Sequence, residues 1–460
     1  MINELRVGCL RMSCLRLLQY TAAPPPFCLC RCRRHRTKLF TTSCSAERQK
    51  VVVISGPTGA GKSRLSLELA KRLNGEIISA DSVQVYKGLD IGSAKPSIAE
   101  RQEVPHHLVD ILHPSEDYSV GQFYEDARQL TREILGRGRV PIVTGGTGLY
   151  LRWFIYGKPD VPKSSPEITL EVNSELGNLQ RDGDWDAAID LVIKAGDPGV
   201  QSLAANDWYR LRRRLEILKS SGASPSAFQV PYNSFKENFE TSKLDLDDSS
   251  GIITSAAELQ ESNSTKDLDY DFNCFFLSTQ RLDLYRALDF RCEDMCLDDG
   301  ILSEANWLLD LGLLSNSNSA TRAIGYRQAM DYLLISREQG GLSSSKDFYR
   351  FLSEFQKASR NFAKRQLTWF RNEPLYQWID ASKPLENVLN FICDAYNDQT
   401  GEIKVPESLC MNKDVSNHKQ VRLLKSYRTR NRHFIGREDC SGILEWVRRT
   451  QGQHTASSIC

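Results

Sequence analysis

Long apolar runs are missing from the 460-residue chain. None is long enough to span a bilayer, so we predict that the protein is not integral to a membrane. Net charge is also almost missing, because 59 Lys and Arg residues offset 58 Asp and Glu residues. With 40% hydrophobic and 25% charged residues, the composition is that of a globular protein with room for two or three domains. Informative charge patterns must therefore be local.

Cysteines in close pairs are scarce. Of the 13 cysteines, six lie within the first 44 residues, and the others are scattered singly except for Cys292 and Cys296, one helical turn apart. This distribution does not resemble a disulfide framework and favours a reducing compartment. Near the C-terminus the Cys-x2–4-Cys pairing of a zinc finger is absent, so no metal site is predicted from Cys410, His418, His433 and Cys440.

Acidic residues are scarce at the N-terminus. Residues 1–48 are rich in Arg, Ser, Thr and Cys and contain only Glu4 and Glu47 as acids, which is typical of a transit peptide. We therefore expect import into a plastid or mitochondrion. The alternatives are a disordered leader without an address, or a start site upstream of the one that a cytoplasmic form uses.

A phosphate-binding pattern stands between a predicted strand and a predicted helix. The apolar run Val51–Ile54 predicts the strand, and Leu65, Leu69 and Leu73 give the helix its apolar face. The loop between them fits the P-loop pattern at every constrained position: Gly56, Pro57, Thr58, Gly59, Ala60, Gly61, Lys62 and Ser63. Its backbone N–H groups and the helix N-terminus attract anions, Lys62 adds a positive charge, and Ser63 can bind a phosphate-bound Mg²⁺. We therefore predict a site for a di- or triphosphate.

The sequence predicts two further strands whose carboxyl ends would border the same site. Residues 76–80 form an apolar run that ends at Asp81, and the buried strand 140–144 ends in the small-residue loop Gly145–Gly148. Chemistry in open α/β sheets collects at the carboxyl ends of strands, so we expect Asp81 to face the anion. The alternative is an Asp that caps a turn or binds Mg²⁺ through water. The polar loop 90–96, which contains Lys95, is either a structural turn or a substrate loop.

Beyond residue 150 the pattern is mainly helical. Leu211, Leu215 and Leu218 share one helix face, while four arginines within residues 210–214 follow Trp208 and Tyr209. Such arginines usually lie on a solvated face, but their density beside two aromatic residues favours nucleic-acid binding. Farther along, an aromatic series at seven-residue spacing is expected in the core: Phe355, Phe362 and Trp369.

These patterns predict five parts of the chain. Residues 1–48 form a transit peptide or leader, and residues 49–150 form the first part of a P-loop α/β core with a doubly wound parallel sheet. Residues 151–280 form a mainly helical insertion with a disordered acidic segment at 240–271. Residues 281–395 complete the catalytic domain with helices, and residues 396–460 form a flexible basic tail, with a nonspecific RNA grip as the functional alternative.

Seven stretches, in this order, resemble one protein family: Gly56–Ser63, 79–88, 90–96, Gly145–Tyr150, 206–214, Arg322–Arg327 and 363–371. Together they resemble the tRNA dimethylallyltransferases, or tRNA isopentenyltransferases, and in particular the plant tRNA-type enzymes of cytokinin biosynthesis. The resemblance covers residues 51–380. It implies a P-loop NTPase-like doubly wound parallel sheet with a mainly helical inserted domain and a helical C-terminal part. The zinc finger of some eukaryotic members has no counterpart here.

The resemblance also implies a reaction. A dimethylallyl group would pass from dimethylallyl diphosphate to N6 of adenine 37, in the anticodon stem-loop of tRNAs that read codons beginning with U. The modified tRNA would be a source of cis-zeatin-type cytokinins. Mg²⁺ is the implied cofactor, and neither a membrane nor an obligate protein partner is implied.

Family roles transfer to matching positions of this sequence. Asp81 matches the base, Lys62 and Arg291 match residues that hold the diphosphate, and Thr58 and Thr147 match the channel lining. The positions that match tRNA contacts are Asp81, Ser82, Val83, Gln84, Thr147, Tyr209, Arg210, Leu211, Arg212, Arg213, Arg322, Gly325, Tyr326 and Arg327.

Three other functions share parts of this pattern. A P-loop kinase of a nucleotide or small metabolite would use ATP as donor. An adenylate isopentenyltransferase would use free AMP, ADP or ATP as acceptor. An RNA-binding, nucleotide-dependent switch would transfer no group.

Overall fold

A parallel β-sheet organises the structure. The computed structural model describes residues 48–237, 268–400, 404–413 and 418–452. Six strands pair in the order β3-β2-β4-β1-β5-β6, and every pair between them is parallel. The strands are β1 (Lys50–Ser55), β2 (Gly75–Ser79), β3 (His106–His107), β4 (Val140–Gly145), β5 (Asp271–Ser278) and β6 (Gln377–Asp380). The predicted α/β class with a parallel sheet is confirmed.

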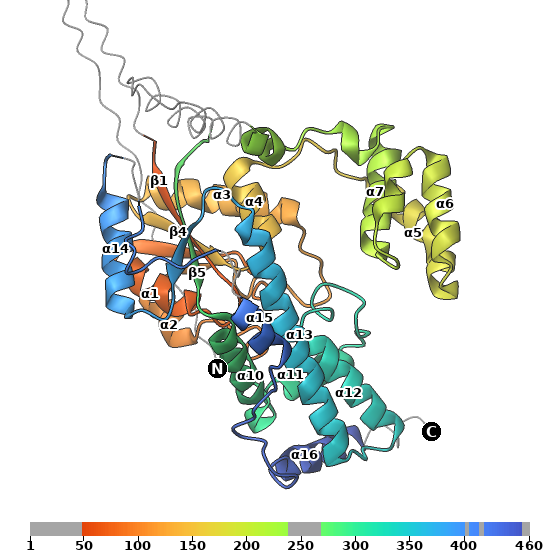
Figure 1. The fold of residues 1–460 in the computed structure, drawn as a ribbon. Coiled ribbons are helices and arrows are strands. Elements are labelled where there is room, and N and C mark those ends of the chain that lie inside the picture. The colour runs from red at the N-terminus through yellow and green to blue at the C-terminus, as the bar shows by residue number, and fades with distance from the viewer. Residues whose placement is uncertain (1–47, 238–267, 401–403, 414–417, 453–460) are drawn as a thin grey trace, which may run out of the picture. The chain divides into compact units, whose positions relative to one another are not determined.

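Both faces of the sheet are covered by helices (Figure 1). Side chains alternate along β1, so Val51 and Val53 enter one core cluster while Val52 and Ile54 enter the other. On the second face lie α1 (Lys62–Leu73) and α14 (Leu385–Asn397). On the first face lie α3 (Val120–Gly136), α4 (Gly148–Tyr156) and α13 (Ser345–Arg371). A strand buried on both sides is continuously apolar, as the run 51–54 is.

Two strands differ from the sequence prediction. Residues 271–278 were assigned to the helical insertion and its acidic segment, but they form β5, which pairs with β1 on one side and with β6 on the other. Residues 377–380 lie in the part expected to be helical and form β6. Their partners are far away in sequence, so neither strand belongs to a local strand-helix-strand pattern.

The insertion contains a small helical bundle with its own core. Its helices are α5 (Pro166–Asp182), α6 (Trp185–Ala195) and α7 (Trp208–Ser221). Val172, Leu176 and Val192 pack against Leu211 and Leu215, all fully buried. Each helix begins at a side-chain N-cap: Ser165, Asp184 and Asp207.

The remaining helices follow β5. They are α10 (Arg281–Asp294), α11 (Gly300–Asp310), α12 (Tyr326–Glu338), α15 (His418–Lys425) and α16 (Ser441–Gln451), while the short α2 (Ile98–Glu103) precedes β3. No helix in the described ranges combines the length and the apolar character needed to cross a membrane.

The prediction of a flexible tail after residue 396 is wrong for its described parts. Phe434, Cys440 and Val447 are buried in the main core, and Cys410 forms a strand bridge with Ile379. Ile443, Leu444 and Val447 of α16 (Ser441–Gln451) do have helical spacing, but the many basic residues before them favoured a flexible tail. The predicted leader lies almost wholly outside the described residues, as does most of the predicted acidic segment 240–271.

Candidate active site

The loop between β1 and α1 exposes backbone donors to an open space. Gly61, the N-cap of α1, has a left-handed φ of 84°, and a side chain added there would meet no atom within 4 Å. Gly56 meets a close neighbour instead, because an added Cβ would lie 2.4 Å from the Leu277 carbonyl oxygen of β5. In the part of the chain that the structure describes, the N–H groups of Lys62 and Ser63 have no backbone acceptor. The loop therefore has the geometry of an anion site.

A cavity of about 770 Å³ lies over this loop. Its walls come from the loops after β1, β2 and β4, from α10 and α13, and from residues 319–324. The predicted site residues that line it are Thr58, Gly59, Gly61, Lys62, Ser63, Asp81, Ser82, Val83, Gln84, Thr147, Arg291 and Arg322. Gly56, Pro57 and Ala60 are buried in the loop itself. The ends of the parallel strands thus bring the predicted diphosphate site and the predicted base together.

Lys62 and Arg291 place two cations beside one carboxylate. Lys62 Nζ donates a 2.9 Å hydrogen bond to the Pro57 carbonyl oxygen. Burial, reinforced by the charge of Arg291, lowers the pKa of Lys62 to about 8, while Asp81 acts in the opposite direction. Burial also lowers the pKa of Arg291. The group still stays protonated at neutral pH, because the ordinary pKa of a guanidinium is very high. A bound diphosphate would relieve the repulsion between the two cations.

The Asp81 side chain both stabilises a turn and lines the cavity. Its Oδ1 accepts a 2.9 Å hydrogen bond from the Val83 N–H, as an Asp that fixes its own turn does. Among the described residues its Oδ2 has no hydrogen-bond partner, and the side chain lines the cavity. The turn-capping role and a role in chemistry are therefore compatible, because they use different oxygens.

The loops after β2 and β4 pack tightly against each other. Thr147 Oγ1 accepts a 3.3 Å hydrogen bond from the Ser82 N–H. A Cβ added to Gly145 would lie 2.1 Å from the Ala80 carbonyl oxygen, so no larger residue fits without displacing β2. This contact fixes the position of Asp81 relative to β4.

Gln366 of α13 is a site residue that the sequence analysis does not identify. Its side chain is only 6% exposed, its Oε1 accepts from the Thr58 N–H at 2.9 Å, and its Nε2 donates to the Gly146 carbonyl at 3.0 Å. It therefore joins the P-loop to the loop after β4. A contact across 308 residues leaves no local pattern. The usable signal is a polar residue on the apolar face of a long helix, four residues after Phe362.

The core prediction for the aromatic series of α13 holds for Phe355, and Trp369 packs against the same core cluster, but the prediction is wrong for Phe362. Phe355 is 2% exposed, whereas Phe362 and Trp369 are partly exposed. Phe362 lines the cavity, because α13 forms part of its wall. The guanidinium of Arg152 lies 4.0 Å from the centre of the Trp369 ring.

The sequence is similar to those of known proteins. Residues 84–373 match the family model described as IPP transferase, and residues 49–110 match the model described as isopentenyl transferase. The chain is 61% identical to tRNA dimethylallyltransferase 9 of Arabidopsis thaliana over 439 residues, which cover 93% of this chain and 94% of the relative. The chain belongs to the tRNA dimethylallyltransferase family. The predicted family is therefore confirmed.

Other members are more distant. The chain is 38% identical to a tRNA dimethylallyltransferase of Protochlamydia amoebophila over 344 residues, which cover 75% of this chain and 87% of the relative. Its fold is similar to the crystal structure of a eukaryotic dimethylallyltransferase acting on tRNA, with a TM-score of 0.57 and 25% identity, over 78% of this chain and 83% of the other. The predicted P-loop NTPase-like fold of this family is thereby confirmed.

Three positions that match tRNA contacts in this tRNA dimethylallyltransferase family are buried: Leu211, Gly325 and Tyr326. Leu211 belongs to the core of the α5–α7 bundle, because it lies on the apolar face of α7. The Tyr326 hydroxyl donates a 2.7 Å hydrogen bond to Glu304. The side chains of Leu211 and Tyr326 are therefore engaged within the protein, and contact of these positions with tRNA stays a prediction.

Tyr326 instead supports the loop 90–96. Glu304 accepts hydrogen bonds from the N–H groups of Asp90 and Ile91, both at 2.7 Å, and of Gly92 at 3.0 Å. A Cβ on Gly92 would lie 2.5 Å from the Tyr326 ring. In the same loop Lys95 is 2% exposed and pairs with Asp90 at 2.7 Å and with Asp110. These contacts fit a structural turn, but residues 92–96 also line the main cavity, so the role of a substrate loop stays a prediction.

Gln84 is also engaged within the protein. Its Oε1 accepts a 2.8 Å hydrogen bond from Ser79 Oγ, and its Nε2 lies 3.3 and 3.2 Å from the carbonyl oxygens of Ser93 and Ala94. The side chain lines the cavity and holds two loops together. Its contact with tRNA stays a prediction.

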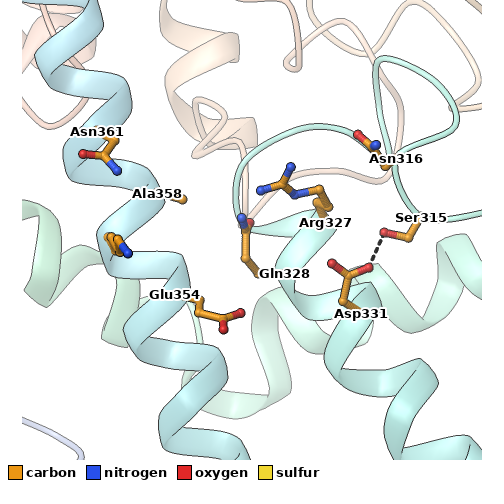
Figure 2. Close-up of a pocket in the computed structure, with 9 residues that line it drawn as sticks. Ser315, Asn316, Arg327, Gln328, Asp331, Glu354, Ala358 and Asn361 are labelled. Atoms are coloured by element: carbon orange, nitrogen blue, oxygen red, sulfur yellow. Dashed lines mark hydrogen bonds between the residues drawn. The ribbon is translucent and has the colours of Figure 1, made fainter. Parts of the chain in front are cut away.

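Arg327 lies in a second, open pocket of about 640 Å³ between α12 and α13 (Figure 2). Asp331 and Glu354 line the same pocket, and a 2.6 Å hydrogen bond from Ser315 holds Asp331 in place. Arg322, five residues earlier, lines the main cavity. The segment Arg322–Arg327 therefore contributes to two separate pockets.

The first turn of α7 exposes two of the predicted tRNA-binding side chains. Tyr209 is 64% exposed, and the Arg210 side chain is 69% exposed. Arg213 donates 3.0 Å hydrogen bonds to Ser164 and Glu216. Burial lowers the pKa of Arg212, and Arg322 adds to the decrease. RNA binding by these side chains stays a prediction.

Proposed function

We propose that this protein transfers a dimethylallyl group from dimethylallyl diphosphate to N6 of adenine 37, in tRNAs that read codons beginning with U. One observation carries the proposal: a single cavity holds the Asp81 carboxylate together with the P-loop, Lys62 and Arg291. A prenyl transfer from a diphosphate needs both a base and a cationic leaving-group site. The names of the Arabidopsis and Protochlamydia relatives describe the same type of enzyme.

The proposed step uses both halves of the cavity. The exocyclic amine of adenine is a weak nucleophile, because its lone pair is delocalised into the ring. N6 forms a bond to the first carbon of the allyl group, the C–O bond breaks with its electron pair on the diphosphate, and Asp81 accepts the N6 proton. Lys62, Arg291 and the P-loop N–H groups neutralise the charge that develops on the leaving group.

Magnesium fits this site as a diphosphate-bound ion. Among residues 48–237, 268–400, 404–413 and 418–452, no group of three or more His, Cys, Asp or Glu side chains could hold a metal. Mg²⁺ commonly takes most of its ligands from phosphates and water, with one or two from the protein. The Ser63 hydroxyl, at the cavity wall, would be the ligand from this chain. The ion would supply further charge neutralisation for the diphosphate.

A tRNA acceptor accounts for the cationic and aromatic surface beyond the diphosphate site. The target adenine is stacked in an anticodon loop and must be extruded to reach Asp81. Ser82, Val83 and Thr147 line the cavity around that carboxylate. Tyr209 and Arg210 supply exposed stacking and phosphate-binding groups that a free nucleotide would not need.

The test compares acceptors and donors in parallel. Purified protein receives labelled dimethylallyl diphosphate with total tRNA, AMP or ATP, and separately γ-labelled ATP. We expect label in tRNA only, recovered as N6-isopentenyladenosine at position 37 after nuclease digestion. Equal transfer to AMP would support an adenylate isopentenyltransferase, a labelled phosphate product would support a kinase, and tRNA binding without transfer would support a switch.

The lowered pKa of Lys62 predicts the pH dependence of donor binding. Below about pH 8 Lys62 carries its proton, and above it the site loses one of two cations. We expect the KM for dimethylallyl diphosphate to rise above pH 8, by roughly tenfold at pH 9.5, in a wild-type pH series. The Lys62→Met variant should lack this inflection. If the donor KM of the variant shows the same inflection with pH, the inflection belongs to another titratable group.

We also propose that residues 1–48 direct import into a plastid or mitochondrion, and that the modified tRNA is a source of cis-zeatin-type cytokinins. The import proposal is supported by the basic, acid-poor composition of that segment. Full-length protein with a C-terminal fluorescent tag should enter the organelle, whereas a version without residues 1–46 should stay in the cytoplasm.

A further inference from the structure

The segment 422–437, here called the C-terminal strap, combines a high positive charge with a fixed position. Residues 418–437 contain seven Lys and Arg residues and no Asp or Glu. This part of the chain lies outside the residues that the family models match. Its described contacts show how it is held and which of its charges are left free.

Two buried carboxylates of α10 hold the strap. Asp289 and Glu293 are both fully buried. The Tyr427 hydroxyl donates a 2.7 Å hydrogen bond to Asp289, and Glu293 accepts from the N–H groups of Arg432, His433 and Phe434 at 2.8–3.1 Å. A carboxylate that accepts several backbone hydrogen bonds fixes the path of the chain it binds. The strap is thus part of the packed structure.

Helix α13 holds the strap from the other side. Arg360 donates a 3.0 Å hydrogen bond to Thr429 Oγ1 and also pairs with Asp289. Gln356 Nε2 donates a 3.0 Å hydrogen bond to Asn431 Oδ1. The strap therefore lies across both α10 and α13.

These contacts place the strap beside the active-site cavity. On α10, Leu288 and Arg291 line the cavity while Asp289 and Glu293 hold the strap. On α13, Phe362 and Arg365 line the cavity, whereas Arg360 holds the strap. Adjacent faces of the same two helices thus carry the cavity wall and the strap.

Five exposed cations on this segment have no ion-pair partner within the described ranges: Arg422, Lys425, Arg428, Arg430 and Arg437. Lys364 and Arg365, on the exposed surface of α13, are also without an acidic partner there. Arg432, in contrast, pairs with Asp294. The free charges thus gather where α10, α13 and the strap meet.

We propose that the C-terminal strap is a second phosphate-binding surface for tRNA, with Arg422, Lys425, Arg428 and Arg430 contacting the backbone of the stem whose loop enters the cavity. The proposal rests on the proposed function, since it names where that same substrate is held. The unpaired cations of the strap are complementary in charge to a polyanion such as the RNA backbone. The fixed path of the strap means that its cations are positioned before the RNA arrives, which lowers the entropic cost of binding.

The test neutralises two of these charges and compares the effect with that of removing two exposed charges elsewhere, one of which, Arg448, pairs with Glu445. The double variant Arg428→Gln/Arg430→Gln removes two free charges from the strap. The control Arg448→Gln/Arg449→Gln removes two exposed charges from α16, outside the cavity and the strap. Kinetics with tRNA and dimethylallyl diphosphate, and binding of fluorescent tRNA without donor, are measured over a salt series.

We expect the strap variant to raise the KM for tRNA by roughly fivefold or more and to reduce the salt slope of tRNA binding by about 1.4–1.8. Its kcat at saturating tRNA and its KM for the donor should stay at the wild-type values, as should all parameters of the control. An unchanged KM for tRNA and an unchanged salt slope would overturn the proposal. So would a raised donor KM alone, because the strap would then act only as a brace for Arg291. Failure of the wild-type protein to modify any tRNA would instead refute the proposed function.

Discussion

Replacement of Asp81 by Asn is expected to reduce transfer to tRNA by about 10²–10⁴-fold, the usual contribution of a general base. The amide cannot accept the N6 proton. Its oxygen can still accept the hydrogen bond that Oδ1 receives from the Val83 N–H, so the turn after β2 should persist. The measurement is the single-turnover rate at saturating donor and tRNA, together with donor affinity by calorimetry.

The control for this variant is Asp160→Asn, at an exposed position after α4. It removes the same charge and should transfer at the wild-type rate. Near-normal turnover of Asp81→Asn would remove Asp81 from the mechanism. Loss of donor binding in Asp81→Asn would show that the carboxylate organises the site and does not act as the base.

Replacement of Lys62 by Met is expected to lower kcat/KM for the donor by roughly 10–100-fold. Hydrogen bonds from a charged donor contribute about 1.5–3 kcal/mol, and methionine keeps the apolar volume while removing the charge. Arg291 remains and continues to hold the diphosphate. The measurement is the dependence of initial rate on dimethylallyl diphosphate at saturating tRNA.

The same variant should be more stable than wild type without ligand. Because the pKa of Lys62 in the folded protein, about 8, lies below the ordinary lysine value of 10.5, the charged lysine opposes folding at neutral pH. Wild-type stability should gain from this group as pH rises from 8 to 10.5, and Lys62→Met should lack that gain. Thermal unfolding with and without donor tests this, since the donor should stabilise wild type more than the variant. A lower Tm for the free variant would contradict the expectation.

Local sequence predicts the parts of this site that are built from consecutive residues. The P-loop from Gly56 to Ser63 is one, and Asp81 at the end of β2 is another, because strand, turn and helix signals adjoin them. Gln366 and Tyr326 act through partners more than 20 residues away, so no period or spacing reveals their roles. For Leu211 the period was informative: it placed the side chain on the apolar face of α7, and the resemblance alone suggested an RNA contact.

The same distinction explains the C-terminal part. The positive charge of residues 418–437 is visible in composition and suggested a flexible tail. Its fixed path depends on Asp289 and Glu293, which lie in an earlier helix and look like ordinary charges of an amphipathic surface. A buried carboxylate cannot be told from a solvated one without the partners that surround it.

The pairing of β1 with β5 also has a consequence for synthesis of the chain. Strand β1 pairs with β5, from Lys50 opposite Asp271 onward, and the α5–α7 bundle is encoded between them. A ribosome that adds about 5–20 residues per second needs roughly 10–45 s to travel from one strand to the other. During that interval the bundle can fold on its local contacts, while one edge of β1 stays unpaired. A nascent chain that stalls before β5 therefore has an exposed strand edge beside its P-loop, which is the type of surface that chaperones recognise and that aggregates when they fail.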